Sequence, residues 1–246
     1  MKRYITLIFS LTALLASAGP LGTSRLEVRL GYNIGGTAPL GMPASIRHIH
    51  RFALTPSINV GGDATWEIKH RFGMRAGIHF ENKGMDEEAR VKNYRMELVK
   101  GGESLAGVFT GNVETFVTQW MTTVPVQMTY DLNNEVCLRV GPYVSMLTQG
   151  RFTGHAINGY LRVDDPTGAK VELGKEPGQR GDYDFSEHMR TFQMGVGAGV
   201  DWYFSSHFGL FGELNWGLTG VFKSGFHTVE QTLYPIYGAV GLTYKL

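Results

Sequence analysis

The sequence lacks a second cysteine, a long apolar run and an excess of charge of one sign. Cys137 is the only cysteine among 246 residues, so the chain cannot form an internal disulfide bond. No segment has the ~20 consecutive apolar residues of a transmembrane helix. The 23 Lys and Arg residues nearly balance the 22 Asp and Glu residues, which argues against a nucleic-acid partner. A disulfide scaffold and a bundle of membrane-spanning helices are therefore excluded.

The N-terminus has the three parts of a secretory signal peptide. Lys2 and Arg3 precede a mostly apolar run over residues 4–15, and Ala16-Ser17-Ala18 follows as a cleavage site with small residues. We expect residues 1–18 to be removed after Ala18 and residues 19–246 to form one domain. Without Lys2 and Arg3, 21 basic residues remain against 22 acidic ones, so the exported chain is nearly neutral.

Apolar side chains recur at every second position in eight segments of the chain. Such alternation is typical of strands with one apolar and one polar face. The last segment, for example, carries Ile236, Val240 and Leu242 on its apolar face and Thr243 and Lys245 on the other. The predicted strands cover residues 25–35, 52–66, 72–80, 116–130, 136–146, 192–204, 208–218 and 234–246.

The connections between these segments alternate between short and long. The short ones are residues 67–71, 131–135 and 205–207, and the long ones are 36–51, 85–112, 150–190 and 223–232. Short periplasmic turns and long extracellular loops are typical of bacterial outer-membrane barrels. We therefore predict an all-β fold, an eight-stranded antiparallel up-and-down β-barrel that crosses the outer membrane. The second and third long segments are expected to project as hairpins, with a turn at Asp164–Gly168.

Aromatic residues at the strand ends distinguish this prediction from a soluble lipocalin-like barrel, whose apolar face would point inward. Membrane barrels carry an aromatic belt at each interface. The opposite face of these strands is poor in lysine and rich in glycine, unlike a solvated surface. The predicted belts contain Trp66, Phe72, Tyr130, Trp202, Phe204 and Phe208 beside the short turns, and Tyr32, Phe80, Phe192, Trp216, Phe222 and Tyr234 toward the long loops.

The inward face carries five acidic and five basic residues. An eight-stranded barrel is just wide enough for side chains to fill it, and buried charges must be paired. We therefore predict a self-neutralised ion-pair network in place of a channel, with Gly195, Gly197 and Gly199 leaving room for the longer side chains. The predicted network contains Arg25, Glu27, Arg29, Asp63, Arg75, Glu81, Arg139, Asp201, Glu213 and Lys245.

The remaining polar residues do not require a catalytic or metal-binding role. His48 and His50 have a spacing that can bind zinc on a strand, but no third ligand is nearby in the sequence. Residues 182–188 bring Asp182, Asp184, Ser186 and His188 together, yet no sequence motif requires them to meet as a catalytic group. Asp164 and Asp165 fit a turn as well as a calcium site, and Cys137 fits an inert inward filler. We therefore predict no catalytic residue, no metal and no cofactor.

Four segments resemble the PorT-like outer-membrane β-barrel domain family: Gly35–Pro43 with Ile46-Arg47, Phe80–Met85, Gly159–Val163 and Tyr234–Gly238. The resemblance implies an outer-membrane barrel without enzymatic activity, and the family's name-bearer acts in type IX protein secretion. Gly241, Tyr244 and Leu246 resemble the C-terminal signal that the barrel assembly machinery binds, with Leu246 in place of the usual Phe.

The predicted function is that of a non-catalytic envelope protein, structural or interacting through its extracellular loops, in the outer membrane of a Gram-negative cell. Residues 150–190 are the expected contact surface, because their length exceeds what closure of the barrel requires. The expected partners are outer-membrane lipid and lipopolysaccharide, the barrel assembly machinery, and a secretion-system or surface protein. An accessory role in secretion and a rim enzyme acting on lipid A or peptides remain as alternatives.

Overall fold

The computed structural model describes residues 24–41, 43–53, 55, 57–226, 228–229 and 231–246, so the predicted signal peptide lies outside the described residues. No helix in this part of the chain is long and apolar enough to span a bilayer. A single 3₁₀ turn, η1, covers Ser186–His188. The strands are β1 (Ser24–Pro39), β2 (Ile46–Ala53), β3 (Ile58–Lys69), β4 (Phe72–Lys100), β5 (Glu103–Asp131), β6 (Val136–Val163), β7 (Lys170–Leu173), β8 (Gly181–Asp184), β9 (Phe192–Tyr203), β10 (Phe208–Gly217) and β11 (Leu233–Lys245).

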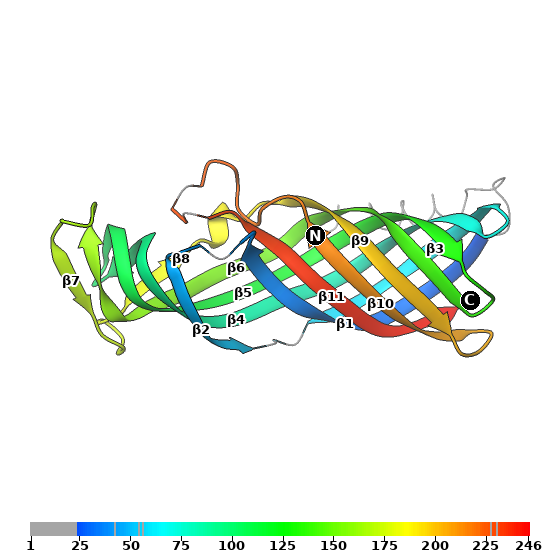
Figure 1. Ribbon diagram of the computed structural model, residues 1–246, viewed down its shortest axis with the longest axis horizontal. Coiled ribbons are helices and arrows are strands. Elements are labelled where there is room, and N and C mark those ends of the chain that lie inside the picture. Colours follow the sequence, from blue (N-terminus) through cyan, green and yellow to red (C-terminus); the bar gives the residue numbers. More distant parts are fainter. Residues whose placement is uncertain (1–23, 42, 54, 56, 227, 230) are drawn as a thin grey trace, which may run out of the picture.

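Eight of these strands close into an antiparallel barrel. The order around it is β1-β3-β4-β5-β6-β9-β10-β11, and β11 pairs with β1 to close the ring. Leu30 of β1, for example, lies between Val60 of β3 and Leu242 of β11. Short turns join the strands at the periplasmic end, on the right in Figure 1, where the C-terminus also lies. The predicted eight-stranded outer-membrane fold is confirmed.

Three barrel strands continue far beyond the rim. β4 and β5 have 29 residues each and β6 has 28, and they extend to the left of the barrel in Figure 1. Segments 85–112 and 150–190 were predicted as long connections, but β4 and β5 cover most of the first, and β6 extends through the second as far as Val163. The predicted turn at Asp164–Gly168 joins β6 to β7, which pairs back along Gly159–Arg162. The second and third long segments thus project as hairpins, as expected.

One predicted strand is wrong. Residues 52–66 form two elements, because β2 ends at Ala53 and β3 begins at Ile58. In the sequence, the apolar alternation of this run is interrupted by a proline at position 56, between Leu54 and Ile58. β2 pairs with the extension of β4 above the barrel, where Phe52 lies opposite Glu87, whereas β3 belongs to the barrel itself.

The outer face of the barrel is apolar and exposed, as lipid contact requires. Leu30, Val140 and Leu214 have exposed fractions of 57%, 58% and 56%. Seven of the predicted belt residues are also exposed, at 42% or more: Phe72, Phe80, Phe192, Trp202, Phe204, Phe208 and Trp216. Tyr32, Tyr130 and Tyr234 are half-buried.

Two predicted belt residues differ from this pattern. Trp66 is only 7% exposed, although alternation places it on the outer face of β3. Phe222 is 8% exposed and packs on Phe152 and Phe226, with ring centroids 4.8 Å apart in both pairs. Phe222 follows the end of β10 at Gly217, so the lipid-facing alternation no longer determines its orientation.

Apolar side chains fill the space enclosed by the projecting strands. We call this cluster the extracellular core, and its members come from β4, β5, β6, β7 and β8 and from the chain on either side of η1 and after β10. Its most buried members are Met85, Val91, Met96, Leu98, Phe109, Val117, Phe152, Ala156, Leu161, Leu173, Met189 and Val221. The molecule therefore has an apolar core above the barrel, while the barrel interior is polar.

The assignment of the outer face to lipid predicts a cost for charge at Val196, which lies near the middle of β9 and is 42% exposed. We expect Val196→Arg to lower the free energy of unfolding by about 2–4 kcal/mol, because a guanidinium would face hydrocarbon. Reversible urea unfolding in phospholipid vesicles measures this value. Asn134→Arg in the exposed turn between β5 and β6 is the matched control, and an equal cost for both substitutions would contradict the assignment.

Candidate functional site

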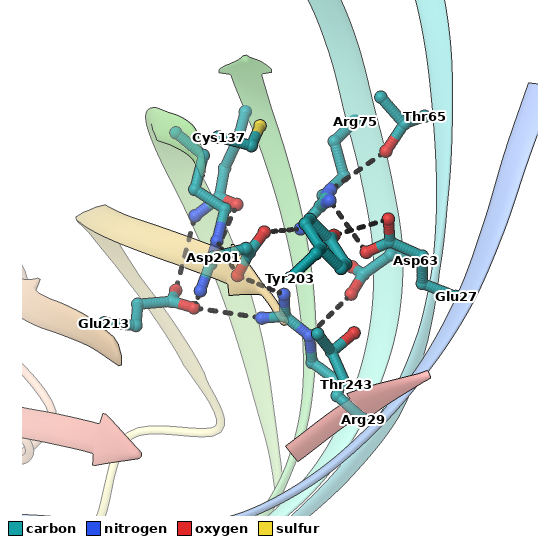
Figure 2. A network of polar contacts seen from close by, with 12 residues as sticks. Glu27, Arg29, Asp63, Thr65, Arg75, Cys137, Asp201, Tyr203, Glu213 and Thr243 are labelled. Carbon is teal, nitrogen blue, oxygen red and sulfur yellow. Dashed lines mark hydrogen bonds and ion pairs between the residues drawn. The ribbon is translucent and has the colours of Figure 1, made fainter. Parts of the chain in front are cut away.

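The centre of the barrel interior is a carboxylate shared by three arginines. Asp201 on β9 accepts hydrogen bonds from Arg75 at 2.7 Å, Arg139 at 3.1 Å and Arg29 at 3.4 Å (Figure 2). The side chains of Asp201, Arg75 and Arg139 are 0% exposed, and that of Arg29 is 1% exposed. These arginines come from β4, β6 and β1, so one residue joins four strands across the interior.

Three further carboxylates pair with these arginines. Glu27 accepts from Arg75 at 2.8 Å and from the Tyr203 hydroxyl at 2.7 Å. Asp63 lies 2.8 Å from Arg29 and 3.0 Å from His79. Glu213 pairs with Arg139 and lies 3.2 Å from Arg29. Each arginine therefore contacts at least two carboxylates, which compensates the desolvation of all seven groups.

Glu81 belongs to a second polar cluster, closer to the extracellular end. Its carboxylate lies 3.2 Å from Lys83 and also accepts from Asn33, Asn59 and Thr123. Lys83 was not among the predicted network residues, although it has the same inward parity as Glu81. It is 3% exposed, and its ammonium group lies over the rings of Tyr143 and Tyr237 at 5.7 and 5.5 Å. The predicted charges thus form more than one group.

Arg25 and Lys245 lie at the periplasmic mouth of the barrel. Arg25 is 2.8 Å from Glu27 and 4.0 Å from Asp131, with 29% of its side chain exposed. The Lys245 ammonium group lies 3.2 Å from the centroid of the Tyr203 ring. Together with Asp131 and the turn that follows it, they line a cavity of about 200 Å³. Arg25 joins the network through Glu27, whereas Lys245 contacts the network only through the Tyr203 ring.

Aromatic rings fill the space that the charges leave. Tyr143, Tyr203, Phe211 and Tyr237 point inward and are 1–6% exposed. The predicted interior contained polar residues and glycines. These four aromatic residues were not predicted there, although they occupy inward positions in the alternation of their strands. The glycines of β9 leave room, as predicted. A Cβ at Gly199 would lie 2.8 Å from the Arg139 guanidinium carbon, and one at Gly195 would lie 2.5 Å from the Tyr143 ring.

Residues 182–188 contain the residue types of a catalytic group, but in the structure their side chains contact different partners. The Ser186 hydroxyl accepts the backbone N–H of Phe152 at 3.0 Å, and Asp184 accepts the backbone N–H of Ser186 at 2.9 Å. The His188 ring stacks on Phe226 with centroids 4.6 Å apart. Asp182 pairs with His155 at 2.7 Å. These contacts hold β8 and η1 in place.

The remaining candidates also have structural contacts. The rings of His48 and His50 meet edge to face at 4.8 Å. Asp165 accepts from the backbone and the hydroxyl of Thr167, both at 2.7 Å, and these bonds lower the pKa of Asp165. Cys137 is 1% exposed. Among the described residues, no three His, Cys, Asp or Glu side chains are grouped as a metal ion would need.

The three residues that resemble an assembly signal lie on β11 and at its end. A Cβ at Gly241 would lie 2.2 Å from the Leu30 carbonyl oxygen, so the close approach of β1 excludes a side chain there. The Tyr244 ring packs on Phe208 at 4.9 Å. Leu246 is 74% exposed, and its backbone N–H donates to Leu26 at 2.9 Å.

The network predicts a large cost for removing its central charge. We expect Asp201→Asn to lower the free energy of unfolding by about 3–5 kcal/mol, because it leaves buried guanidinium groups short of one carboxylate. Asp131→Asn is the control, since that side chain is 42% exposed and 4.0 Å from Arg25. It should cost about 1 kcal/mol or less. Urea unfolding in vesicles compares the two, and similar losses would contradict the central role of Asp201.

Several solved structures of outer-membrane proteins resemble this chain at low sequence identity. The solved structures that resemble the chain include CarO2 of Acinetobacter baumannii, at 12% identity over 90% of this chain and 99% of that one, with a TM-score of 0.43. Ail, the attachment invasion locus protein of Yersinia pestis, matches at 10% identity over 92% and 100% of the two chains, with a TM-score of 0.39. OprG of Pseudomonas aeruginosa matches at 10% identity over 92% and 97%, with a TM-score of 0.32.

No curated protein matches the sequence. A family model described as an outer membrane protein beta-barrel domain matches residues 16–223, most of the chain. Membership implies a location in the Gram-negative outer membrane. The closed barrel, its apolar outer face and this match lead to one conclusion: the chain belongs to the outer membrane protein beta-barrel domain family.

Proposed function

We propose that this protein is a non-catalytic component of the outer membrane that acts as a structural and interaction protein through its extracellular strands. The filled, charge-balanced interior carries the proposal. Seven side chains of Arg, Asp and Glu are buried against one another in the barrel, with aromatic rings around them. Such an interior stabilises the barrel and offers no wide aqueous path, so contacts with other molecules fall to the surface.

The contact surface that we favour lies on residues 150–190, which include β7, β8 and the outer part of β6. Local contacts order this surface. β8 pairs with both β6 and β4, and the Lys100 ammonium group donates to the Glu172 carbonyl at 2.6 Å. A surface that is already ordered loses little conformational entropy when it binds. This supports a role as a rigid platform for a surface or secretion protein.

Lipopolysaccharide is the partner that we propose for β2. Arg47, His48, His50 and Arg51 are all exposed, and in the described part of the chain neither arginine has an ion-pair partner. Phe52, at the end of β2 nearer the barrel, is 47% exposed. A basic segment beside an apolar one matches the boundary between lipid phosphates and acyl chains.

The proposal for β2 predicts a stability that depends on the lipid. We expect lipopolysaccharide in the vesicles to stabilise the wild-type protein relative to neutral phospholipid alone. The double substitution Arg47→Gln, Arg51→Gln should remove about 2 kcal/mol of that gain, about 1 for each cation. Lys92→Gln with Arg95→Gln, on the exposed face further from the barrel, should keep the gain. An undiminished gain in the β2 variant would refute the proposal.

An accessory role in protein secretion is the second candidate, supported by the PorT-like segments at Gly35–Pro43 and Phe80–Met85. Mass spectrometry of secreted and surface proteins in a clean deletion strain separates the candidates. We expect an unchanged set of secreted proteins if the role is structural. Selective loss of a group of secreted proteins would favour the accessory role. A changed lipid A profile, restored by the wild type and not by Asp184→Asn with His188→Gln, would favour an enzyme.

A further inference from the structure

A small cavity of about 90 Å³ opens among the extracellular strands. It lies between the outer parts of β4, β5 and β6, the strand β8, and the chain that leaves β1 and enters β11. Most of its wall is apolar and belongs to the extracellular core or packs against it. The apolar lining includes Ile46, Met85, Val91, Val113, Phe152 and Phe185. Nothing in the proposed structural role requires a cavity here.

One carboxyl group interrupts this apolar wall. Glu87 shares the inward face of β4 with Met85, Ala89 and Val91, which are 2%, 7% and 4% exposed. Burial raises the pKa of Glu87 above its usual range. Among the described residues, Glu87 has no hydrogen-bond or ion-pair partner. Glu87 itself is half-buried. A partly desolvated carboxyl group without a partner costs free energy, so a group that pairs with it would gain affinity.

Two hydroxyl groups lie beside the carboxyl group. Thr115 on β5 is directly opposite Glu87 in the strand register, and both line the cavity. The Thr115 hydroxyl is 2.8 Å from the Tyr183 hydroxyl, which donates to the Glu114 carbonyl at 2.9 Å. Since Tyr183 uses its proton on that carbonyl, the Thr115 hydroxyl donates to Tyr183. The Thr115 oxygen, which lines the cavity, then remains available as an acceptor.

We propose that this cavity binds a small molecule with an apolar body and one ammonium group, with Glu87 as the counter-ion and Thr115 as a further acceptor. An anionic ligand would be repelled by Glu87, and a neutral apolar ligand would leave the carboxyl group without a partner. An ammonium group satisfies the carboxylate and the hydroxyl together, because it has three donors and no acceptor.

The volume limits the size of the ligand. An apolar cavity of ~150 Å³ accommodates benzene. The present cavity of about 90 Å³ is smaller and therefore fits a short alkyl body. We choose n-butylammonium as the probe and n-butanol as its neutral analogue of nearly equal shape, so the two ligands differ mainly in charge.

Ligand-observed NMR titrations with the full-length protein in nanodiscs test the proposal. We expect n-butylammonium to bind the wild type at least tenfold more tightly than n-butanol does. Glu87→Gln should weaken n-butylammonium binding at least tenfold and leave n-butanol binding within twofold. The matched control is Glu88→Gln, one residue along β4 on the opposite face, which should leave both ligands unaffected. Heat-modifiable migration on gels verifies that each variant is folded.

A second variant locates the site without changing any charge. Ala89→Phe places a ring in the cavity wall and should abolish binding of both ligands. The proposal is overturned if n-butylammonium binds equally well to wild type and Glu87→Gln, if Glu88→Gln weakens it as much, or if Ala89→Phe binds it normally. It is also overturned if the wild type binds neither ligand. None of these results bears on the lipid and secretion experiments, so the two proposals fail separately.

Discussion

The contact of Asp201 with three arginines is the interaction on which the barrel depends. Closing a sheet at eight strands leaves an interior with room for side chains and little else. In this chain the inward positions carry charge, so the charges must cancel inside a space that admits little water. Arg29, Arg75 and Arg139 approach the same carboxylate from three strands. No neighbouring pair of strands could satisfy these groups alone, so the network forms only when the barrel closes.

This dependence gives the interior a role in specificity as well as stability. A buried ion pair is often no more stable than apolar side chains of the same volume. Its groups are nevertheless costly to leave unpaired, so a register shift on any strand would separate them. A shift of one residue would also exchange the lipid face with the inward face. Charge pairing inside and hydrophobic contact outside therefore select the same register.

A change in the alternation of β4 marks the point where the chain leaves the membrane. Arg75, Glu81 and Lys83 point into the barrel, and two residues later Met85 begins the apolar face of the extracellular core. The inward residues have odd numbers on both sides of this point. The inward face, however, changes from polar to apolar, and the outward face changes from apolar to polar. Above this point Arg90 is exposed on the outer side. One continuous strand thus crosses lipid and then forms one wall of a water-surrounded domain, and its register with β5 shifts between Val91 and Tyr94.

Sequence patterns predict the barrel far better than they predict this domain. Alternation identified the barrel segments and the inward position of Asp201, because successive side chains of a barrel strand point alternately to lipid and to the interior. The same criterion does not extend the strand that contains Phe80 to Met85 and Val91, because the apolar side chains change from even to odd positions between Phe80 and Met85. The sequence therefore predicts the end of a strand at the point where the strand leaves the membrane. Tyr143 and Phe211 were missed for another reason, since aromatic residues were expected only at the lipid interfaces.

The division into two cores also separates stability from recognition. Substitutions among the barrel charges act on folding, because every such charge contacts at least one partner in the interior. In the extracellular core, by contrast, packing alone would be satisfied by an apolar residue at position 87, as at Met85 and Ala89 on the same face. The acid at this position is half-buried and has no described hydrogen-bond or ion-pair partner. Such a residue is best explained by a partner from solution, which places recognition in the domain where folding imposes the fewest constraints on charge.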